Sequence, residues 1–475
     1  MTNEPLEKKM RINARLRLNI LLSLAMTLPG LASTAIAAPP TDKQLVEEVD
    51  ALVSKTLQEP GGVGLSIAIA RGGKIILARG YGLAEVEHDV SANAETTFRI
   101  GSLTKQFTAA ALMRLIEQDK ISLDDELSAY LPDFPTQSHT VTIRHLLTHT
   151  SGIKSYTGVD EFWQTGATRE LSPEELLAYV KDKKFDFEPG SKFLYNNTAY
   201  YMLGTIIESV SGMSYCEFLQ SEFFGPLGLD RTRCDSNTEL IANRAQGYRL
   251  VAEQLANDGL MGMANPGAAG MLLSSAQDLV KWSMALMNHK VVSADSLTLM
   301  TTPTVLPDGE STGYGFGLMM GDLDGHCRIS HGGGIFGFNS SLAYFPDDDL
   351  YVAVISNSES ASSSRLGNDI VRAALGIKDE VADLLVSPEI MRQFSGTYIL
   401  EQFQLEAQIF EKDGQLFLQA TGQPELRLLY QGKGEFRARI DTSIKVVFEM
   451  RGDSDRSPTF TLHQSGMKVK ANRKP

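Results

Sequence analysis

The sequence predicts an α+β fold with an inserted helical region, followed by a small C-terminal all-β domain. Strand and helix patterns occur near residues 43–81 and return at 314–376, which indicates one layered unit built from both ends of this segment. The chain between about residues 97 and 288 is mainly helical with long loops. From residue 388 onward, short strand patterns follow one another at regular spacing, which is typical of a β-barrel or a sandwich.

An export signal is expected before the fold begins. A basic segment at residues 8–17 precedes a short apolar run at 20–28, and Ala35-Ile36-Ala37 has the small residues of a cleavage site. We expect residues 1–38 to be a signal peptide that directs the protein to the periplasm or the exterior; an uncleaved anchor is the alternative. Loss of residues 1–37 removes five basic and two acidic residues and changes the net charge from −14 to −17. Such an acidic protein is not expected to bind nucleic acid or to stay inserted in a membrane.

The first elements follow from hydrophobic periodicity. Thr41 and Gln44 fit a capping box, and apolar residues between 45 and 57 recur at helical spacing. Strand patterns at 63–70 and 74–81 flank Arg71-Gly72-Gly73, which is typical of a hairpin turn. Downstream, the patterns predict four strands and then a helix, at residues 314–320, 328–333, 340–345, 351–356 and 366–375.

Turn and capping residues delimit the remaining elements. Asn197 is expected to cap a helix that ends at Gly212, and Ser274 or Ser275 to start another that reaches Asn288. We expect one domain at residues 39–380 and a second at 388–475. The strands of the second domain are predicted at 396–400, 405–411, 415–420, 425–430, 435–440, 444–450 and 459–463.

Ser102 and Lys105 are the first candidate catalytic pair. On a helix from residue 102 to about 118 they share a face, which places an amine beside a hydroxyl. The amine activates a serine only when it is neutral, and lowering a lysine pKa to near neutrality takes roughly 4–5 kcal/mol. Apolar neighbours at helical spacing, such as Leu103 and Phe107, predict the burial that supplies this energy. In the simpler interpretation, Ser102 is only an N-cap and Lys105 is a solvated charge.

Two further clusters carry polar groups that suit a reaction site. Tyr195 and Asn197 lie two apart before a helix, where a phenol can relay a proton and an amide can hold the lysine or a substrate carbonyl. His331 precedes three glycines in a strand pattern, and glycines in a strand suggest the close approach of a ligand. The structural alternatives are a core tyrosine beside a capping asparagine, and a plain loop or bulge at residue 331.

Taken together, Ser-x-x-Lys at 102–105, Tyr-x-Asn at 195–197 and His-Gly-Gly at 331–333 resemble the penicillin-recognising serine hydrolases. The resemblance is closest to the branch of class C β-lactamases, D-alanyl-D-alanine peptidases and related carboxylesterases. It implies an antiparallel sheet flanked by helices, with an all-helical insertion. Blocks at 97–102, 143–152, 226–229 and 269–275 extend the likeness to roughly residues 43–376, and the C-terminal region resembles a lipocalin-like appendage of several non-lactamase relatives.

The family resemblance also implies a role for each motif residue. Ser102 would form the acyl-enzyme, and Lys105 would assist its deprotonation. Tyr195 would be the acid/base partner that serves first the leaving group and then the hydrolytic water. Asn197 would orient the substrate amide.

His331 stands where many relatives have lysine. A permanent charge there favours β-lactam and C-terminal carboxylates, whereas histidine is only partly charged near neutrality. Relatives with histidine at this position are often peptidases, D-amino-acid-specific hydrolases or esterases. Gly333 and Gly334 would lie on the strand beside the substrate, and the backbone N–H groups of Ser102 and Gly334 would form the oxyanion hole.

The sequence therefore predicts an exported serine hydrolase that acts through a Ser102 acyl-enzyme on small amide or ester substrates, namely D-amino-acid peptides or carboxylic esters. A β-lactamase is the alternative among enzymes, and a penicillin-binding sensor that acylates without turnover is the alternative outside them. No cofactor is expected. His145 and His149 lie four apart but lack a zincin glutamate and a third ligand, so they are expected to form structural hydrogen bonds and not a metal site.

Three cysteines are an odd number for an oxidising compartment. Cys216 and Cys234 form the one close pair, and either a bridge or two buried thiols would fit. Cys327 has no evident partner and is expected to be structural.

Overall fold

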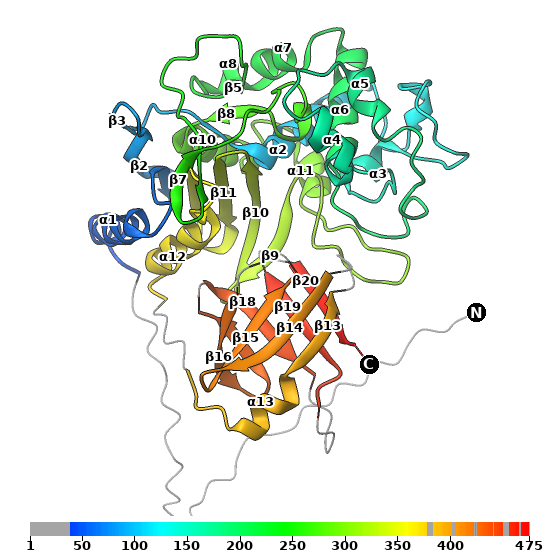
Figure 1. Cartoon of the computed structure of the whole chain (residues 1–475). Helices are drawn as coiled ribbons and strands as arrows, with labels where there is room; N and C mark the ends of the chain where they lie inside the picture. Colours follow the sequence, from blue (N-terminus) through cyan, green and yellow to red (C-terminus); the bar gives the residue numbers. More distant parts are fainter. Residues whose placement is uncertain are drawn as a thin grey trace, which may run out of the picture. The chain divides into compact units, whose positions relative to one another are not determined.

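A computed structural model gives the fold of the chain (Figure 1). It describes residues 39–377, 383–400, 405–421, 423, 425–439, 441–449, 456–464 and 467–474. The expected signal peptide at 1–38 lies outside the described residues, as do the predicted strand ends at 440 and 450.

A seven-stranded antiparallel sheet joins strands from residues 64–91 and 319–356. The strand order is β3-β2-β1-β12-β11-β10-β9, so the N-terminal hairpin pairs with strands that lie more than 250 residues later. Leu65 of β1, for example, pairs with Tyr81 on one side and Ser356 on the other. The strands are β1 Gly64–Arg71, β2 Lys74–Glu85, β3 Val90–Ser91, β9 Met319–Leu323, β10 His326–Ile335, β11 Phe338–Phe345 and β12 Leu350–Ser356.

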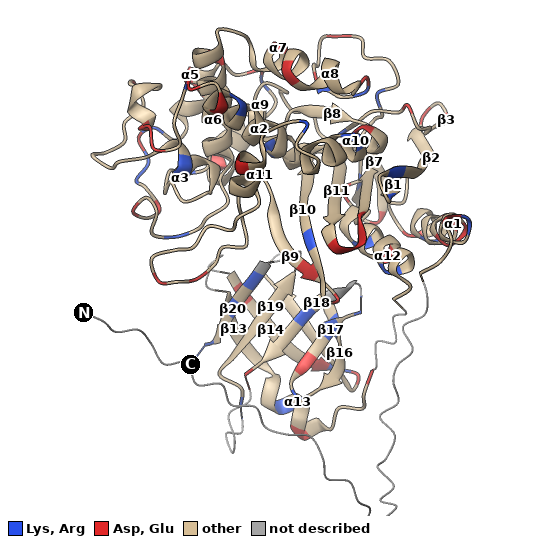
Figure 2. Ribbon diagram, turned by 180° about the vertical axis from the view of Figure 1, so that it is seen from behind, with Lys and Arg blue, Asp and Glu red and all other residues tan. Residues whose placement is uncertain are grey.

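Two helices cover one face of this sheet. α1 (Asp42–Gln58) begins with the predicted Thr41 capping box, and α12 (Ser363–Leu375) ends at Gly376 in the left-handed conformation. Figures 1 and 2 show α1 and α12 side by side. Alternate residues of β1, such as Ile67 and Ile69, pack with them in one apolar cluster, whereas Ala68 and Ala70 point into the other cluster. The alternation explains why the strand is buried on both faces.

The inserted region is mainly helical and packs against the opposite face, with α10 in contact with β1 and β12. Its helices are α2 Thr104–Glu117, α3 Ile143–Leu147, α4 Asp160–Thr165, α5 Pro173–Ala178, α6 Asn197–Ser211, α7 Tyr215–Leu219, α8 Gly225–Leu227, α9 Gly267–Gly270, α10 Ala276–Met287 and α11 Ala294–Met300. Short strands accompany them at β4 Phe98–Arg99, β5 Arg233–Cys234, β6 Tyr248–Val251, β7 Gln254–Asn257 and β8 Leu272–Ser274.

The C-terminal strands form a closed eight-stranded barrel, which decides between the barrel and the sandwich. After α13 (Pro388–Phe394), the strands are β13 Gly396–Leu400, β14 Leu405–Lys412, β15 Gln415–Ala420, β16 Leu426–Gly432, β17 Glu435–Ala438, β18 Asp441–Phe448, β19 Thr459–Gln464 and β20 Met467–Arg473. β20 was not predicted from the sequence, and it closes the barrel by pairing with β13 and β19.

One predicted strand is wrong in its first half. Residues 314–318 form a loop joined to β9 by an isolated bridge between Tyr314 and Met319, and the strand begins only at Met319. Gly317 has a φ of +69°, and a Cβ there would lie 2.6 Å from the Lys105 carbonyl oxygen. The loop therefore packs its backbone directly on α2, which an extended strand does not do.

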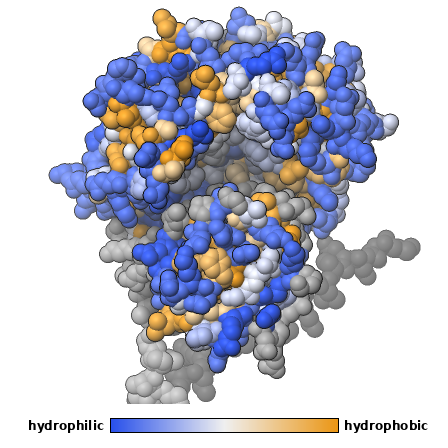
Figure 3. All heavy atoms as spheres, in the orientation of Figure 1, coloured by the Kyte–Doolittle hydropathy of each residue, from blue (hydrophilic) through white to orange (hydrophobic). Residues whose placement is uncertain are grey.

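The surface of the described residues is mixed in charge. In Figure 2 the acidic and basic residues are interspersed along the ribbon, and Figure 3 shows a mostly hydrophilic face with small groups of hydrophobic residues. Among the residues that the structure describes, no helix has both the length and the apolar character needed to span a bilayer.

Candidate active site

Ser102 lies in a 3-10 turn at Gly101–Leu103, immediately before α2. It is therefore not the N-cap of the predicted helix, which starts two residues later. In a 3-10 turn, residues three apart lie one above the other, so Ser102 still faces Lys105. Gly101 has a φ of +50°, and a Cβ there would lie 2.9 Å from the backbone of Gly334. Only glycine brings the serine turn this close to β10.

Lys105 is completely buried, and its Nζ contacts only neutral groups. The Nζ atom lies 2.8 Å from Asn197 Oδ1, 2.9 Å from the Ala269 carbonyl oxygen and 3.1 Å from Ser102 Oγ. Desolvation by burial holds the lysine pKa well below its usual value. A neutral amine has two N–H groups and one lone pair. The two nearer atoms, Asn197 Oδ1 and the Ala269 carbonyl oxygen, accept the two N–H groups. The lone pair therefore faces the serine hydroxyl.

Tyr195 flanks the same pair from the loop before α6. The Lys105 Nζ lies 4.7 Å from the centre of its ring. Although 37% of the residue is exposed, its hydroxyl end is enclosed, and burial raises the phenol pKa, an effect opposed by a hydrogen bond with Ser102. Tyr195 is therefore a neutral phenol at pH 7, which can donate a proton.

Asn197 is the first residue of α6 and not its cap. The cap is Asn196, whose Oδ1 accepts a hydrogen bond from the Ala199 N–H at 2.9 Å. The prediction of Asn197 as the cap is wrong by one residue. The Asn197 side chain is consequently free for the site: its Oδ1 accepts from Lys105, and its Nδ2 donates to Thr157 Oγ1 at 3.2 Å.

His331 is buried in β10 and is held by two hydrogen bonds. Its Nδ1 donates to the Gly332 carbonyl oxygen at 2.6 Å, so its Nε2 accepts from the Tyr314 hydroxyl at 3.1 Å. Burial, together with the positive charge of Lys105 when protonated, lowers the histidine pKa to about 3. The expected partial charge near neutrality is therefore wrong, and the imidazole is uncharged. Tyr314 is buried behind His331 and was not recognised as its partner.

The glycines of β10 serve two different purposes. β9 pairs with β10 only as far as Ser330, so the edge beyond it has no strand partner among the described residues. A Cβ at Gly333 would lie 2.0 Å from the Ile100 carbonyl oxygen, so this glycine allows the serine segment to pack on the strand. Gly334 has open space at the Cβ position. A ligand can approach Gly334, whereas protein backbone already occupies the space beside Gly333.

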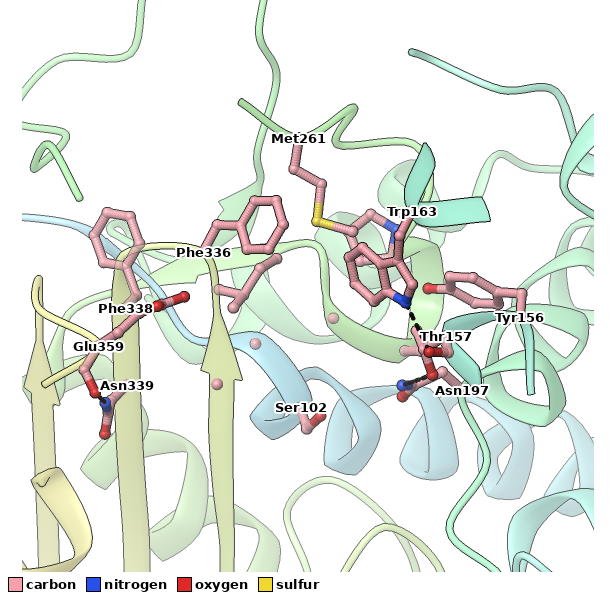
Figure 4. Close-up of a pocket in the computed structure, with 16 residues that line it drawn as sticks. Ser102, Tyr156, Thr157, Trp163, Asn197, Met261, Phe336, Phe338, Asn339 and Glu359 are labelled. Carbon is pink, nitrogen blue, oxygen red and sulfur yellow. Dashed lines mark hydrogen bonds between the residues drawn. The ribbon is translucent and has the colours of Figure 1, made fainter. Parts of the chain in front are cut away.

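Two pockets, each of about 530 Å³, meet at Ser102 and Gly334. We name them by one aromatic residue in each. The Trp163 pocket (Figure 4) also contains Asn197, Met261, Phe336 and Glu359. The Phe193 pocket also contains Tyr195, Arg328, His331 and Asn368. The candidate site is thus a cleft in which two chemically different pockets meet at the serine.

His149 forms structural hydrogen bonds, as expected, and these position the segment that carries Tyr195, which was not predicted. Its Nδ1 accepts from the Asn196 N–H at 3.1 Å, and its carbonyl oxygen accepts from the Leu194 N–H at 3.0 Å. Its ring lies 4.3 Å from that of Tyr195 and 4.7 Å from that of Tyr314. The residue has a φ of +58° and is fully buried. His149 therefore fixes the backbone on both sides of Tyr195.

The remaining polar candidates are structural. His145, like His149, accepts a backbone hydrogen bond, in its case from Thr142. No cluster of three or more metal-binding side chains occurs in the part of the chain that the structure describes. Cys216 and Cys234 form a disulfide, which decides between the two alternatives left by the sequence, and Cys327 is a free, exposed thiol on β10.

The chain is similar to known proteins over most of its length. The β-lactamase family model matches residues 49–376. Penicillin-binding protein 4* of Bacillus subtilis (strain 168) is 28% identical over 88% of this chain and 97% of its own length. The D-aminopeptidase of Gluconobacter oxydans (strain 621H) is 27% identical over 80% of this chain and 71% of its own length.

A solved structure extends the likeness over nearly the whole chain. The octameric penicillin-binding protein homologue from Pyrococcus abyssi superposes with a TM-score of 0.65 and 26% identity, covering 90% of this chain and 99% of that one. The fold class predicted from the sequence is confirmed, including the C-terminal barrel. The chain belongs to the β-lactamase family and is a serine hydrolase of the β-lactamase and penicillin-binding type.

Proposed function

We propose that the protein hydrolyses small amide or ester substrates through an acyl-enzyme on Ser102, with D-amino-acid peptides or carboxylic esters as the substrate class. The observation that carries the proposal is the environment of Lys105. A buried amine of lowered pKa, with two neutral hydrogen-bond acceptors and a serine hydroxyl 3.1 Å away, is placed to act as the base.

The proposed acylation uses each group once. Neutral Lys105 takes the proton of Ser102, and Oγ forms a bond to the substrate carbonyl carbon. The N–H groups of Ser102 and Gly334 hold the oxyanion. Tyr195 gives its proton to the departing amine or alkoxide as the carbonyl–leaving-group bond breaks, and the lysine proton passes to the tyrosine. In deacylation, Tyr195 takes a proton from the attacking water as it passes its own to neutral Lys105. The proton then moves from Lys105 to Ser102 Oγ as the acyl–oxygen bond breaks.

The substrate class follows from the uncharged His331. The imidazole has no positive charge to attract a carboxylate beside the scissile bond, which is the group that a β-lactam presents. This favours esters, and amides or peptides without a carboxylate beside the scissile bond, over β-lactams. The D-aminopeptidase name of one relative supports the peptide alternative. Asn197 would hold the substrate amide while it retains its contact with Lys105.

The test is intact mass measured during incubation with a p-nitrophenyl ester, a D-alanyl peptide and a chromogenic cephalosporin. We expect a transient adduct and turnover with the ester or the peptide, and a slower or persistent adduct with the cephalosporin. Ser102→Ala should abolish both adduct and turnover, whereas Ser128→Ala, at an exposed serine, should not. Turnover unaffected by Ser102→Ala would refute the mechanism.

Export and the domain limits belong to the same proposal. We infer that residues 1–38 are a signal peptide, that residues 39–380 carry the hydrolase, and that 388–475 carry the barrel domain. The basic and apolar segments before Ala35-Ile36-Ala37 support export to the periplasm or the exterior. Cell fractionation and N-terminal sequencing test it: a full-length cytoplasmic protein would contradict export.

A further inference from the structure

The two pockets at Ser102 are assigned to different parts of a bound substrate. Tyr195 and His331 line the Phe193 pocket and are not among the residues of the Trp163 pocket. Under the proposed function, Tyr195 gives its proton to the leaving group. The leaving group therefore occupies the Phe193 pocket, and the acyl group extends into the Trp163 pocket.

The walls of the Trp163 pocket are apolar and aromatic. Trp163 is 42% exposed, and its Nε1 donates to the Thr157 carbonyl oxygen at 2.8 Å, which fixes the indole. The ring of Phe336 lies 5.9 Å from it, and Met261 lies alongside (Figure 4). An exposed indole with a fixed orientation offers a surface on which a hydrocarbon chain can pack, and aromatic faces also attract cations.

Glu359 supplies a charge at one end of this pocket. Among the described residues that line the pocket, it alone has an ionisable carboxylate or a cationic group. Its Oε1 accepts from the Gly337 N–H at 3.3 Å, and its backbone carbonyl accepts from Asn339 Nδ2 at 3.0 Å. Figure 4 shows Glu359 beside Phe338, on the far side of the pocket from Asn197. The contact with the Gly337 N–H anchors the turn through one oxygen of the carboxyl group.

A second carboxylate, Asp258, lies behind Glu359. Only 4% of the Asp258 side chain is exposed, and no N–H or O–H donor of the described residues reaches its Oδ2. Burial, followed by the hydrogen bond and the charge of Asp258, raises the pKa of Glu359. Arg249 lies 3.5 Å from Asp258 Oδ1 and compensates one of the two negative charges. Without a ligand, a proton shared by the two carboxyl groups supplies the second positive charge, and an ammonium can take its place.

We propose that the Trp163 pocket selects acyl groups that end in a cationic amine, with Glu359 as the residue that recognises the amine. The hydrocarbon part of the acyl chain lies between Trp163 and Phe336, and the ammonium takes the place of the shared proton beside Glu359 and Asp258. This inference rests on the proposed function, because it needs the acyl group of a Ser102 substrate in this pocket. It adds a class of acyl group that the family assignment does not specify.

The experiment compares two esters that differ only in the terminal ammonium, p-nitrophenyl 6-aminohexanoate and p-nitrophenyl hexanoate. Since a hydrogen bond to a charged group contributes about 1.5–3 kcal/mol, we expect the wild-type kcat/KM to favour the amino ester by about tenfold to hundredfold. Glu359→Gln keeps an acceptor for the Gly337 N–H and should lose this preference, with the hexanoate kcat/KM changed by less than about threefold. Glu310→Gln, at an exposed glutamate that lines neither pocket, is the matched control.

The outcomes separate this inference from the function on which it rests. Equal kcat/KM for both esters in the wild type overturns it without any variant, and so does a Glu359→Gln enzyme that keeps the preference. If Glu359→Gln loses turnover of both esters, the wild-type preference and its loss at high ionic strength decide the question. Failure of Ser102→Ala to reduce turnover of either ester overturns the proposed function instead.

Discussion

Replacement of Lys105 by methionine tests whether the buried amine is neutral. Methionine fills a similar volume but neither donates to Asn197 and Ala269 nor accepts a proton. Removal of a general base costs about a hundredfold to ten-thousandfold in rate, so we expect the acylation rate to fall by that factor. Lys290→Met, at an exposed lysine, should leave the rate unchanged.

The same variant has a pH-dependent effect on stability whose sign follows from the pKa. The folded-state pKa of Lys105 is lowered, so in the window up to the unfolded pKa near ~10.4 the unfolded chain binds a proton that the folded chain does not. Wild-type stability therefore rises with pH relative to the variant, by up to about 1.4 kcal/mol per pH unit. Two buried acceptors left without donors in the variant, Asn197 Oδ1 and the Ala269 carbonyl, cost about 1–3 kcal/mol each at every pH.

Urea unfolding at pH 7, 8 and 9 measures the difference in free energy of unfolding between wild type and variant. The constant cost of the unpaired acceptors shifts all three values equally, so only their slope reports on the amine. A slope near zero would mean that Lys105 is protonated in the folded protein, and the proposed role as base would then be wrong. Acylation within tenfold of the wild type would refute it independently.

Three further predictions follow from single features of the structure. His331→Gln should make the free energy of unfolding less sensitive to acid. Between about pH 6 and 4 the imidazole takes up a proton in the unfolded chain but not in the folded protein, where its pKa is about 3. In urea titrations the wild type should therefore lose up to ~1.4 kcal/mol more per pH unit than the variant as the pH falls. Replacement of both Cys216 and Cys234 by alanine should lower the free energy of unfolding by about 2–4 kcal/mol, and equal denaturation midpoints would contradict this. Gly101→Ala should slow acylation at least about a hundredfold because its Cβ would lie 2.9 Å from the β10 backbone; Gly228→Ala has a similar positive φ but open space, and should keep the wild-type rate in the mass assay.

Local patterns predicted the parts of the site that depend on neighbouring residues. Ser102 and Lys105 share a face although Ser102 lies in a 3-10 turn and not in an α-helix, because residues three apart face one another in both. The position of the α6 cap failed for an equally local reason. Two consecutive asparagines offer the same capping group, and only the surrounding contacts decide which side chain turns toward the helix.

Long-range contacts account for what the sequence did not reveal. The loop at 314–318 reads as a strand, and nothing in its pattern indicates that Tyr314 reaches His331. The glycines of β10 predicted the close approach of a ligand. At Gly333, the missing side chain instead leaves room for the carbonyl oxygen of Ile100, which lies over 200 residues earlier in the chain. β20 was missed since its lysines and arginine hide the alternation of Val469 and Ala471, which point into the barrel.

The groups around Ser102 also depend on one another electrostatically. Lys105, His149 and His331 are basic side chains enclosed together, and each has a pKa lowered first by burial. The two histidines are lowered further by Lys105, and His149 by His331. The first proton to enter therefore makes each later one more costly, so the site titrates as a unit and not residue by residue. A neutral lysine base is thus maintained by the whole enclosure, and one carboxylate placed within it would stabilise the ammonium and remove the base.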